Sequence, residues 1–335
     1  MNWDIVGHTW AVELLQGQLA RGQMHHAYLL TGPQGVGRRT LALRLAQALN
    51  CLEPPAPGMP CGTCRACRLI AQMQHPDLSV VQAEAVGGTL KVDQVRELQR
   101  SLALAPYEAR YRVALLLRFE EAHLSAANAL LKTLEEPPPN VILILTASSA
   151  EDLLETIVSR CEVLRLRPLP LSLVESGLQA RWSLDQDEAR LLAHISNGRL
   201  GYAVFLHDDG DFLETRQDWL DELFRLLQAD LVERFHFADQ AAKDRSTLRE
   251  LLTVWLSYWR DVLLDAAGTG VPLTNIDREA EIHQLAAHLA LADVYNLIIS
   301  VEDKLEAINS NANLRLVLEN LLLDLPRLAL ASDIL

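Results

Sequence analysis

Short runs of apolar residues alternate with longer segments of helical periodicity over about the first 165 residues. Residues 40–49, which follow the first of these runs, carry apolar side chains at helical spacing. Near-continuous apolar runs separated by helices are typical of a parallel sheet that helices cover on both faces. The predicted strands are His26–Thr31, Leu78–Gln82, Arg112–Leu117, Val141–Thr146 and Val163–Leu166.

The pattern changes at Arg167–Leu171 (RPLPL), where two prolines interrupt the alternation of strands and helices. The helical segment Asp185–Ser196 follows, and beyond residue 208 leucines recur at i, i+3, i+4 and i+7. The sequence therefore predicts an α/β domain with a parallel sheet over residues 1–167, a small helical domain over 168–207 and an all-α domain over 208–335.

Composition and net charge indicate the compartment of this chain and how it could contact DNA. It contains no run of the roughly 20 apolar residues that a membrane span needs, and its start, MNWDIVGHTW, lacks the order of a signal peptide. We therefore expect a cytoplasmic protein without a membrane segment. The formal net charge is −14, and an acidic chain repels the phosphates of DNA. Contact with DNA would need a local basic patch or positive charge from partner subunits.

A glycine-rich loop, Gly32–Thr40 (GPQGVGRRT), lies between the first predicted strand and the helix that follows it. This is the context in which a phosphate-binding loop works. Glycines such as Gly32, Gly35 and Gly37 let the chain curl, so that backbone N–H groups and the helix N-terminus face a phosphate.

The two residues after the last glycine depart from a working loop. A lysine normally reaches the β- and γ-phosphates there, and a Ser or Thr hydroxyl next to it holds Mg²⁺. Arg38 and Arg39 occupy these positions, and Thr40 comes one residue late. Two interpretations stay open: a loop kept only as a fold element, or a site that binds ATP or ADP without hydrolysing it. Neither predicts ATP turnover by this chain.

The end of the third predicted strand also differs from that of a site that hydrolyses ATP. An acidic residue that helps to position Mg²⁺ is expected there, but Arg112–Leu117 continues into Arg118. Glu120 and Glu121 are candidate replacements that lie two or three residues further on. We interpret them instead as the solvated acidic start of a helix.

Four of the five cysteines, Cys51, Cys61, Cys64 and Cys67, fall within 17 residues. Such a cluster in a reducing compartment indicates a metal site rather than disulfides. Four thiolates complete the tetrahedral coordination of Zn²⁺ with no open position, which makes a zinc site structural. Free or partly paired thiols and an iron–sulfur cluster are the alternatives.

Several segments together resemble the bacterial clamp-loader subunits of the AAA+ class. The signal is dense over residues 1–170, where the cysteine insertion after the loop helix also resembles this family, and thinner beyond. The segments are Ile5–Gly7 (IVG), His26–Gly37 (HAYLLTGPQGVG), Asn128–Pro138 (NALLKTLEEPP), Ser159–Cys161 (SRC) and Asn311–Leu316 (NANLRL).

Within that family the departures favour a non-hydrolysing subunit over the ATPase (gamma/tau) subunits. The ATPase subunits have the lysine and hydroxyl that Arg38 and Arg39 replace, and an acidic pair where this chain has Leu117 and Arg118. A Gly-x-x-Arg motif of the lid domain is represented here by Gly198–Gly201 (GRLG), which ends in glycine.

The resemblance implies an AAA+-type P-loop domain carrying a zinc module (51–67), a helical lid and a C-terminal collar. It implies a hetero-oligomer with gamma/tau and delta subunits that opens a sliding clamp and places it on primed DNA during replication. Arg160, in the SRC motif, would reach the γ-phosphate of a neighbour's ATP and act as an arginine finger in trans. An active clamp-loader ATPase and a scaffold with no role in hydrolysis are the alternatives.

Overall fold

The computed structural model describes residues 3–85, 87–310 and 312–327. Asn311, with which the NANLRL segment begins, therefore lies outside the described residues. The chain divides into two compact units, Met1–Leu184 with Gly198–Tyr202, and Asp185–Asn197 with Ala203–Leu335. The predicted division into three domains stays a prediction, because the helical segment 168–207 is shared between these units.

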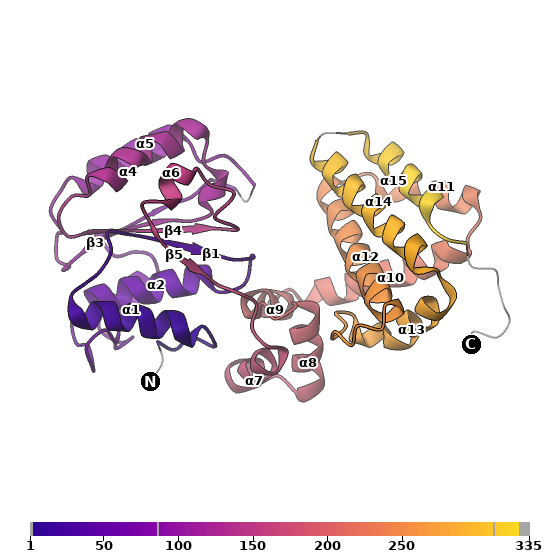
Figure 1. The fold of residues 1–335 in the computed structure, drawn as a ribbon, viewed down its shortest axis with the longest axis horizontal. Helices are drawn as coiled ribbons and strands as arrows, with labels where there is room; N and C mark the ends of the chain where they lie inside the picture. The colour runs from indigo at the N-terminus through magenta and orange to yellow at the C-terminus, as the bar shows by residue number, and fades with distance from the viewer. Residues whose placement is uncertain (1–2, 86, 311, 328–335) are drawn as a thin grey trace. The chain divides into compact units, whose positions relative to one another are not determined.

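The first unit is built on a five-stranded parallel sheet with the strand order β2-β3-β4-β1-β5 (Figure 1). The prediction of a parallel sheet is confirmed. The strands are β1 (Ala27–Thr31), β2 (Leu78–Val81), β3 (Arg112–Leu116), β4 (Val141–Ala147) and β5 (Glu162–Arg165). The helical elements of this unit are α1 (Thr9–Arg21), α2 (Arg38–Asn50), α3 (Arg65–Ala71), α4 (Val92–Leu102), η1 (Phe119–Glu121), α5 (Leu124–Glu135), α6 (Glu155–Val158) and α7 (Leu171–Trp182).

Two apolar layers sandwich the sheet, because alternate strand residues point to opposite faces. Tyr28 and Leu30 of β1 pack with α1 and α2 on one face. Ala27 and Leu29 pack with α4, α5 and α6 on the other (Figure 1). The strands read as continuous apolar runs because both of their faces are buried. The carboxyl end of β1, which lies between β4 and β5, leads directly into the glycine-rich loop.

The second unit is helical throughout the residues that the structure describes. Its core surrounds the adjacent rings of Trp255, Tyr258 and Trp259 on α12, all of them fully buried. Its elements are α8 (Gln186–Ile195), most of α9 (Leu200–Asp208), α10 (Gly210–Gln228), α11 (Leu231–Ala241), α12 (Arg245–Ala266), η2 (Ile276–Arg278), α13 (Glu279–His288), α14 (Leu291–Asn309) and α15 (Leu314–Asp324).

No single helix among the described residues has both the length and the apolar character to cross a membrane. One pair, Ile276–His288 and Leu291–Ile308, meets that test only when its two parts are joined across a bend of 118°.

Candidate functional site

The glycine-rich loop adopts the backbone that its glycines allow. Gly32, Gly35 and Gly37 all have positive φ angles, of 144°, 82° and 109°. Gly37 caps the N-terminus of α2, as a phosphate-binding loop requires. The sequence therefore predicted the position and the shape of the loop correctly.

The start of α9 lies directly on this loop. The Gly201 N–H donates a hydrogen bond to the Gly35 carbonyl oxygen at 2.8 Å. A Cβ atom at Gly35 would stand 2.7 Å from Tyr202 Cβ, and one at Gly201 would stand 2.9 Å from the Gly35 oxygen. Both glycines are thus required by a close backbone approach. The Gly35 carbonyl is engaged by protein at the turn where phosphates would be cradled.

Arg199 lies two residues before Gly201, which stands at the position of the missing lid arginine. Its guanidinium carbon stands over the Tyr202 ring, 4.5 Å from the ring centroid. Burial lowers the pKa of Arg199, and the nearby Tyr202 opposes this effect.

Arg38, at the position of the lysine, is buried and faces Glu120 of the same unit. Its Nη1 atom lies 3.9 Å from Glu120 Oε1. Burial lowers the pKa of Arg38, and Glu120 opposes this effect by favouring the charged guanidinium. Arg39 is exposed, and its Nη2 atom contacts Met73 Sδ at 3.5 Å. The two arginines thus point to different surroundings.

The interpretation of Glu120 and Glu121 as solvated residues was wrong. Their side chains are only 21% and 11% exposed. Glu120 Oε1 accepts hydrogen bonds from the N–H and the hydroxyl of Ser148, at 3.2 and 2.8 Å. Glu121 Oε1 accepts one from Arg118 Nε at 2.9 Å and one from the Gly87 N–H at 2.8 Å. Two arginines and two glutamates therefore form a neutral cluster at the carboxyl ends of β3 and β4.

A cavity of about 1090 Å³ adjoins the loop within the same unit. His8, one of its lining residues, bonds through Nε2 to the Val36 carbonyl oxygen at 2.8 Å. Trp10, Arg165 and Arg181 also line the cavity. Space for a small molecule thus remains beside a loop whose turn is covered by α9.

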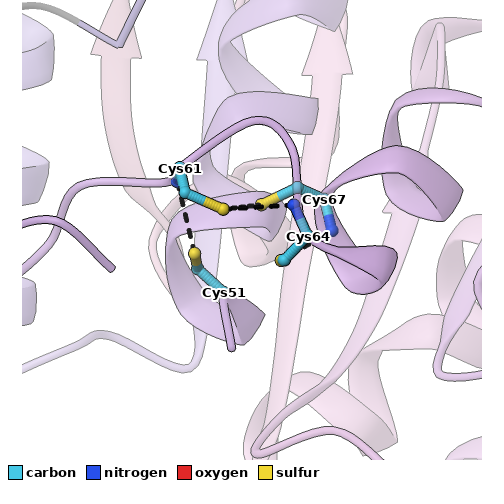
Figure 2. A group of neighbouring side chains, drawn as sticks. All are labelled: Cys51, Cys61, Cys64 and Cys67. Carbon is cyan, nitrogen blue, oxygen red and sulfur yellow. Dashed lines mark hydrogen bonds between the residues drawn. The ribbon is translucent and has the colours of Figure 1, made fainter. Parts of the chain in front are cut away.

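The four clustered cysteines come together in space (Figure 2). Their Sγ atoms all lie within 4.8 Å of one another, and those of Cys61 and Cys67 are 4.0 Å apart. A disulfide would need about 2.05 Å, whereas zinc–sulfur bonds of about 2.3 Å in a tetrahedron separate the sulfurs by about 3.8 Å. The donor set therefore fits one tetrahedral metal ion.

Backbone N–H groups point at these sulfurs and favour their thiolate forms. Cys61 N–H donates to Cys51 Sγ at 3.2 Å, and Cys64 N–H donates to Cys61 Sγ at 3.3 Å. The Cys64 N–H lowers the pKa of Cys61 to about 6, while burial raises the pKa of Cys67. Deprotonated sulfur is the form that binds metal.

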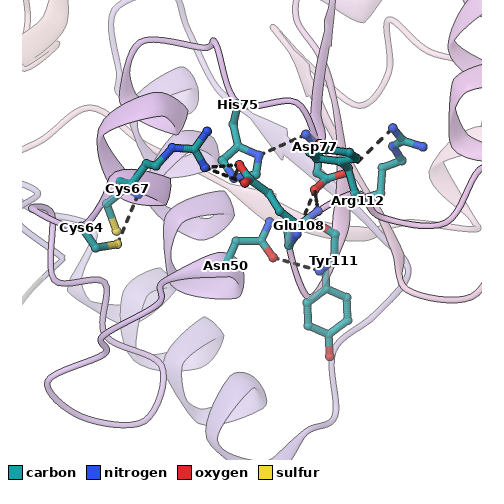
Figure 3. A network of polar contacts seen from close by, with 11 residues as sticks. Asn50, Cys64, Cys67, His75, Asp77, Glu108, Tyr111 and Arg112 are labelled. Carbon is teal, nitrogen blue, oxygen red and sulfur yellow. Dashed lines mark hydrogen bonds and ion pairs between the residues drawn. The ribbon is translucent and has the colours of Figure 1, made fainter.

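Polar contacts tie the cysteine module to the sheet (Figure 3). Gln47 Nε2 donates to the Cys67 carbonyl oxygen at 2.7 Å. Arg65 Nη1 donates to Glu108 Oε1 at 2.7 Å. Asn50 and the backbone of Tyr111 exchange two hydrogen bonds of 2.9 Å, as neighbouring strands do. The module is thus held against the loop that leads into β3.

Asp77 is the fully buried centre of the same network (Figure 3). Its carboxylate accepts hydrogen bonds from the backbone N–H groups of Tyr107, Glu108 and Ala109, at 2.6, 2.9 and 2.9 Å. Burial by itself raises the pKa of Asp77, but these donors and Arg112 outweigh it and hold the pKa below its usual value. Sequence reasoning missed this residue, because no local motif marks it.

Arg160 lies at the surface after the short helix α6, and its side chain is 35% exposed. Its Nη2 atom donates to Glu135 Oε1 at 2.7 Å, and Nη1 donates to the Thr156 carbonyl oxygen at 2.8 Å. The neighbouring Cys161 is remote in sequence from the cysteine module, and burial raises its pKa to about 12. Glu135 belongs to the NALLKTLEEPP segment, so two of the segments that carry the family resemblance meet here.

Comparison with known protein families gives matches to two parts of the chain. Residues 7–170 match a family described as DNA polymerase III, delta subunit. Residues 210–327 match one described as DNA polymerase III, delta subunit, C terminal.

Curated relatives extend the match over most of the chain. DNA polymerase III subunit delta′ of Bacillus subtilis is 31% identical over 93% of this chain and 94% of its own length. The delta′ subunit of Pseudomonas aeruginosa is 35% identical over 75% of each chain. Subunit tau of Escherichia coli is 35% identical over 61% of this chain, but only 32% of tau is covered.

Solved structures of two related proteins cover nearly the whole chain at low identity. A gamma subunit-related protein of Thermotoga maritima is 19% identical, with 93% of this chain and 97% of that chain covered and a TM-score of 0.48. The clamp loader delta protein of Bacillus subtilis is 14% identical, with coverages of 94% and 99% and a TM-score of 0.38.

The parallel sheet with its loop after β1 agrees with the AAA+-type fold that the resemblance implied. The helical C-terminal unit follows it, as in the two family matches. The chain therefore belongs to the delta-prime family of DNA polymerase III clamp-loader subunits.

Proposed function

We propose that this clamp-loader subunit is a stator that does not hydrolyse ATP and that assists ATPase partners in trans. The cluster at the ends of β3 and β4 carries the proposal. Arg38 replaces the phosphate-binding lysine and faces Glu120, while Arg118 is paired with Glu121. The acidic groups that would help to hold Mg²⁺ are thus neutralised within the chain. Gly201 covers the Gly35 turn as well.

Arg160 would act as an arginine finger on the γ-phosphate of a neighbour's ATP. Its surface position and its remaining N–H donors support this role, because a guanidinium offers five N–H groups in a planar fork. An arginine that stabilises charge on the transferred phosphoryl group is worth about 10³–10⁵ in rate. Supplying it from a second subunit makes hydrolysis depend on correct assembly.

The partners that we propose are the gamma/tau ATPase subunits and the delta subunit, in a hetero-oligomer. That assembly would open the sliding clamp and load it on primed DNA in the cytoplasm during replication. The formal net charge of this chain is −14, which favours DNA contact through other members of the assembly.

We also propose that Cys51, Cys61, Cys64 and Cys67 hold a structural Zn²⁺. Sulfur atoms within 4.8 Å of one another suit a single ion. A multi-iron cluster would hold its cysteines further apart, because its own iron and sulfide atoms lie between them.

The test of the arginine finger is ATP hydrolysis by complexes reconstituted from this chain with gamma/tau and delta subunits on primed DNA. Arg160→Ala is expected to lower turnover at the ATP site that it serves by about 10³ or more. The total rate of ATP hydrolysis should fall by the fraction that this one site contributes. The assembly should be unchanged in size-exclusion chromatography.

Arg96→Ala is a matched control, because Arg96 is another exposed arginine of the same unit that pairs with a carboxylate, that of Asp93, at 3.4 Å. It should leave the rate unchanged. A normal rate with Arg160→Ala would favour a scaffold with no role in hydrolysis. Steady ATP turnover by the isolated chain would favour an active ATPase subunit.

A further inference from the structure

The contact between Glu135 and Arg160 joins the C-terminal end of α5 to the residues that follow α6. Glu135 Oε1 and Arg160 Nη2 are 2.7 Å apart, which is the distance of a charge-assisted hydrogen bond. The Thr156 carbonyl oxygen holds the other terminal nitrogen at 2.8 Å. The guanidinium is therefore held from two sides by two separate segments of the chain.

Both segments are anchored in the core of the first unit. Glu135 is the last residue of α5 and follows Leu134, whose side chain is buried. Pro137 comes two residues after Glu135 and prevents the helix from continuing. On the other side, Arg160 comes three residues after the fully buried Ile157. The backbones of Glu135 and Arg160 are thus held at a fixed separation, from which the carboxylate reaches the guanidinium.

The pair leaves part of the guanidinium available. Glu135, Thr156 and, at 3.5 Å, the Ser159 hydroxyl account for three of the five N–H donors. A free arginine side chain on a surface samples many rotamers, and holding it in one of them costs conformational entropy. A carboxylate that restricts this sampling would prepare the remaining donors for an incoming phosphate oxygen.

We propose that Glu135 is a positioning residue for Arg160: it holds the guanidinium in the orientation from which it meets a neighbour's ATP. This inference rests on the proposed role of Arg160 in trans. Glu135 itself touches no nucleotide in this scheme and acts only through Arg160. The first acidic residue of the LEEPP segment thereby has a proposed function that the amphipathic pattern of α5 does not explain.

The experiment compares Glu135→Ala, Glu135→Gln and Glu136→Ala in complexes reconstituted with gamma/tau and delta subunits. Glu136 is a matched control: it is adjacent and exposed, and it makes no side-chain hydrogen bond or ion pair to the described residues. Glu135→Gln keeps an oxygen that can accept the bond from Arg160. Hydrolysis of ATP on primed DNA is measured over a range of ATP concentrations.

Glu135→Ala is expected to lower kcat about fivefold at the site that Arg160 serves, which is the upper range for an exposed ion pair. At that site it therefore removes about four-fifths of the turnover rate that Arg160→Ala removes. KM for ATP should stay the same, because the neighbouring subunit binds the nucleotide. The separate variant Glu135→Gln should have a kcat within about twofold of the wild-type value, because its amide oxygen can still accept the bond from Arg160. Glu136→Ala should have no effect.

A double variant separates positioning from general damage. Adding Glu135→Ala to Arg160→Ala should cause no further loss, because Glu135 acts through the guanidinium alone. An unchanged or raised kcat with Glu135→Ala, while Arg160→Ala is impaired, overturns the positioning role and leaves the arginine finger intact. If Arg160→Ala itself has no effect, the proposed function fails and this inference fails with it.

Discussion

Buried charged residues fix the loops of the first unit. Asp77 is the clearest case, because its carboxylate accepts three backbone N–H groups from residues about 30 positions away. These donors stabilise the buried negative charge, and Arg112, 3.8 Å away, adds to this effect. The contacts of one side chain thus set the path of the chain before β3.

Asp77→Asn is expected to lower the free energy of unfolding by about 3 kcal/mol at pH 7. The new amide nitrogen would face N–H donors where Oδ1 or Oδ2 now accepts them. Asp93→Asn is the control, since Asp93 is exposed and only pairs with Arg96 at 3.4 Å. It should cost less than about 0.5 kcal/mol. Urea unfolding measures both.

The loss with Asp77→Asn should also depend on pH. The folded pKa of Asp77 is lowered, and the unfolded value is about 3.9. The stability from such a carboxyl is fully present above the unfolded pKa and is lost as the pH falls through the folded pKa. The difference between wild type and Asp77→Asn should therefore be constant from about pH 7 to 5 and narrow below about pH 4. A constant difference down to pH 3 would contradict this account.

Among the elements, the cysteine module is an insertion between α2 and β2 that depends on few apolar contacts. Cys67 and Ile70 are its buried anchors, and Cys64 caps α3 by accepting the Cys67 N–H. Polar contacts of Trp3, Gln47, Asn50 and Arg65 also hold the module in place. A segment with so small a core of its own would be stabilised by a bound metal ion.

The module is expected to bind one zinc ion per chain, and Cys64→Ser should lower the zinc content to near zero. Loss of one of four ligands opens the coordination shell and weakens binding strongly. Cys161→Ser is the matched control, because it removes a half-buried thiol that lies outside the module. It should leave the zinc content unchanged. Elemental analysis of the purified proteins gives the metal and its stoichiometry, and iron in place of zinc would refute the zinc assignment.

Elements with a continuous or periodic pattern could be predicted from the sequence. The sequence predicted strand β5 one residue too late, because the bounds of the strand depend on its pairing with β1. Glu162 pairs with Tyr28, and its carboxylate accepts a hydrogen bond from Gln18. The cysteine cluster was predictable because its spacing is local. Contacts between distant segments were not: neither the Glu135–Arg160 pair nor the approach of Gly201 to Gly35 leaves a periodic signal. The burial of Glu120 and Glu121 was missed for the same reason.

At the scale of the whole molecule, the first unit keeps the sheet and loop of a P-loop ATPase, and we propose that it does not hydrolyse ATP. The defects lie on three separate segments: Arg38 and Arg39 on α2, Arg118 after β3, and Gly201 at the start of α9. Because each segment contributes a different part of the catalytic arrangement, repair of one leaves the others missing. These substitutions do not decide whether the cavity beside the loop binds a nucleotide, because binding needs fewer groups than hydrolysis.

This leads to a prediction for the isolated chain. Arg38→Lys combined with Arg39→Thr restores the loop sequence, but no ATP turnover above background is expected. Arg118 still stands where an acidic residue would help to hold Mg²⁺, and Gly201 still covers the Gly35 turn. Turnover is measured as phosphate release and nucleotide binding by calorimetry, so that the two are judged separately. Steady phosphate release that disappears on adding Gly37→Ala would show that the loop alone limits catalysis, and the argument from three segments would then fail.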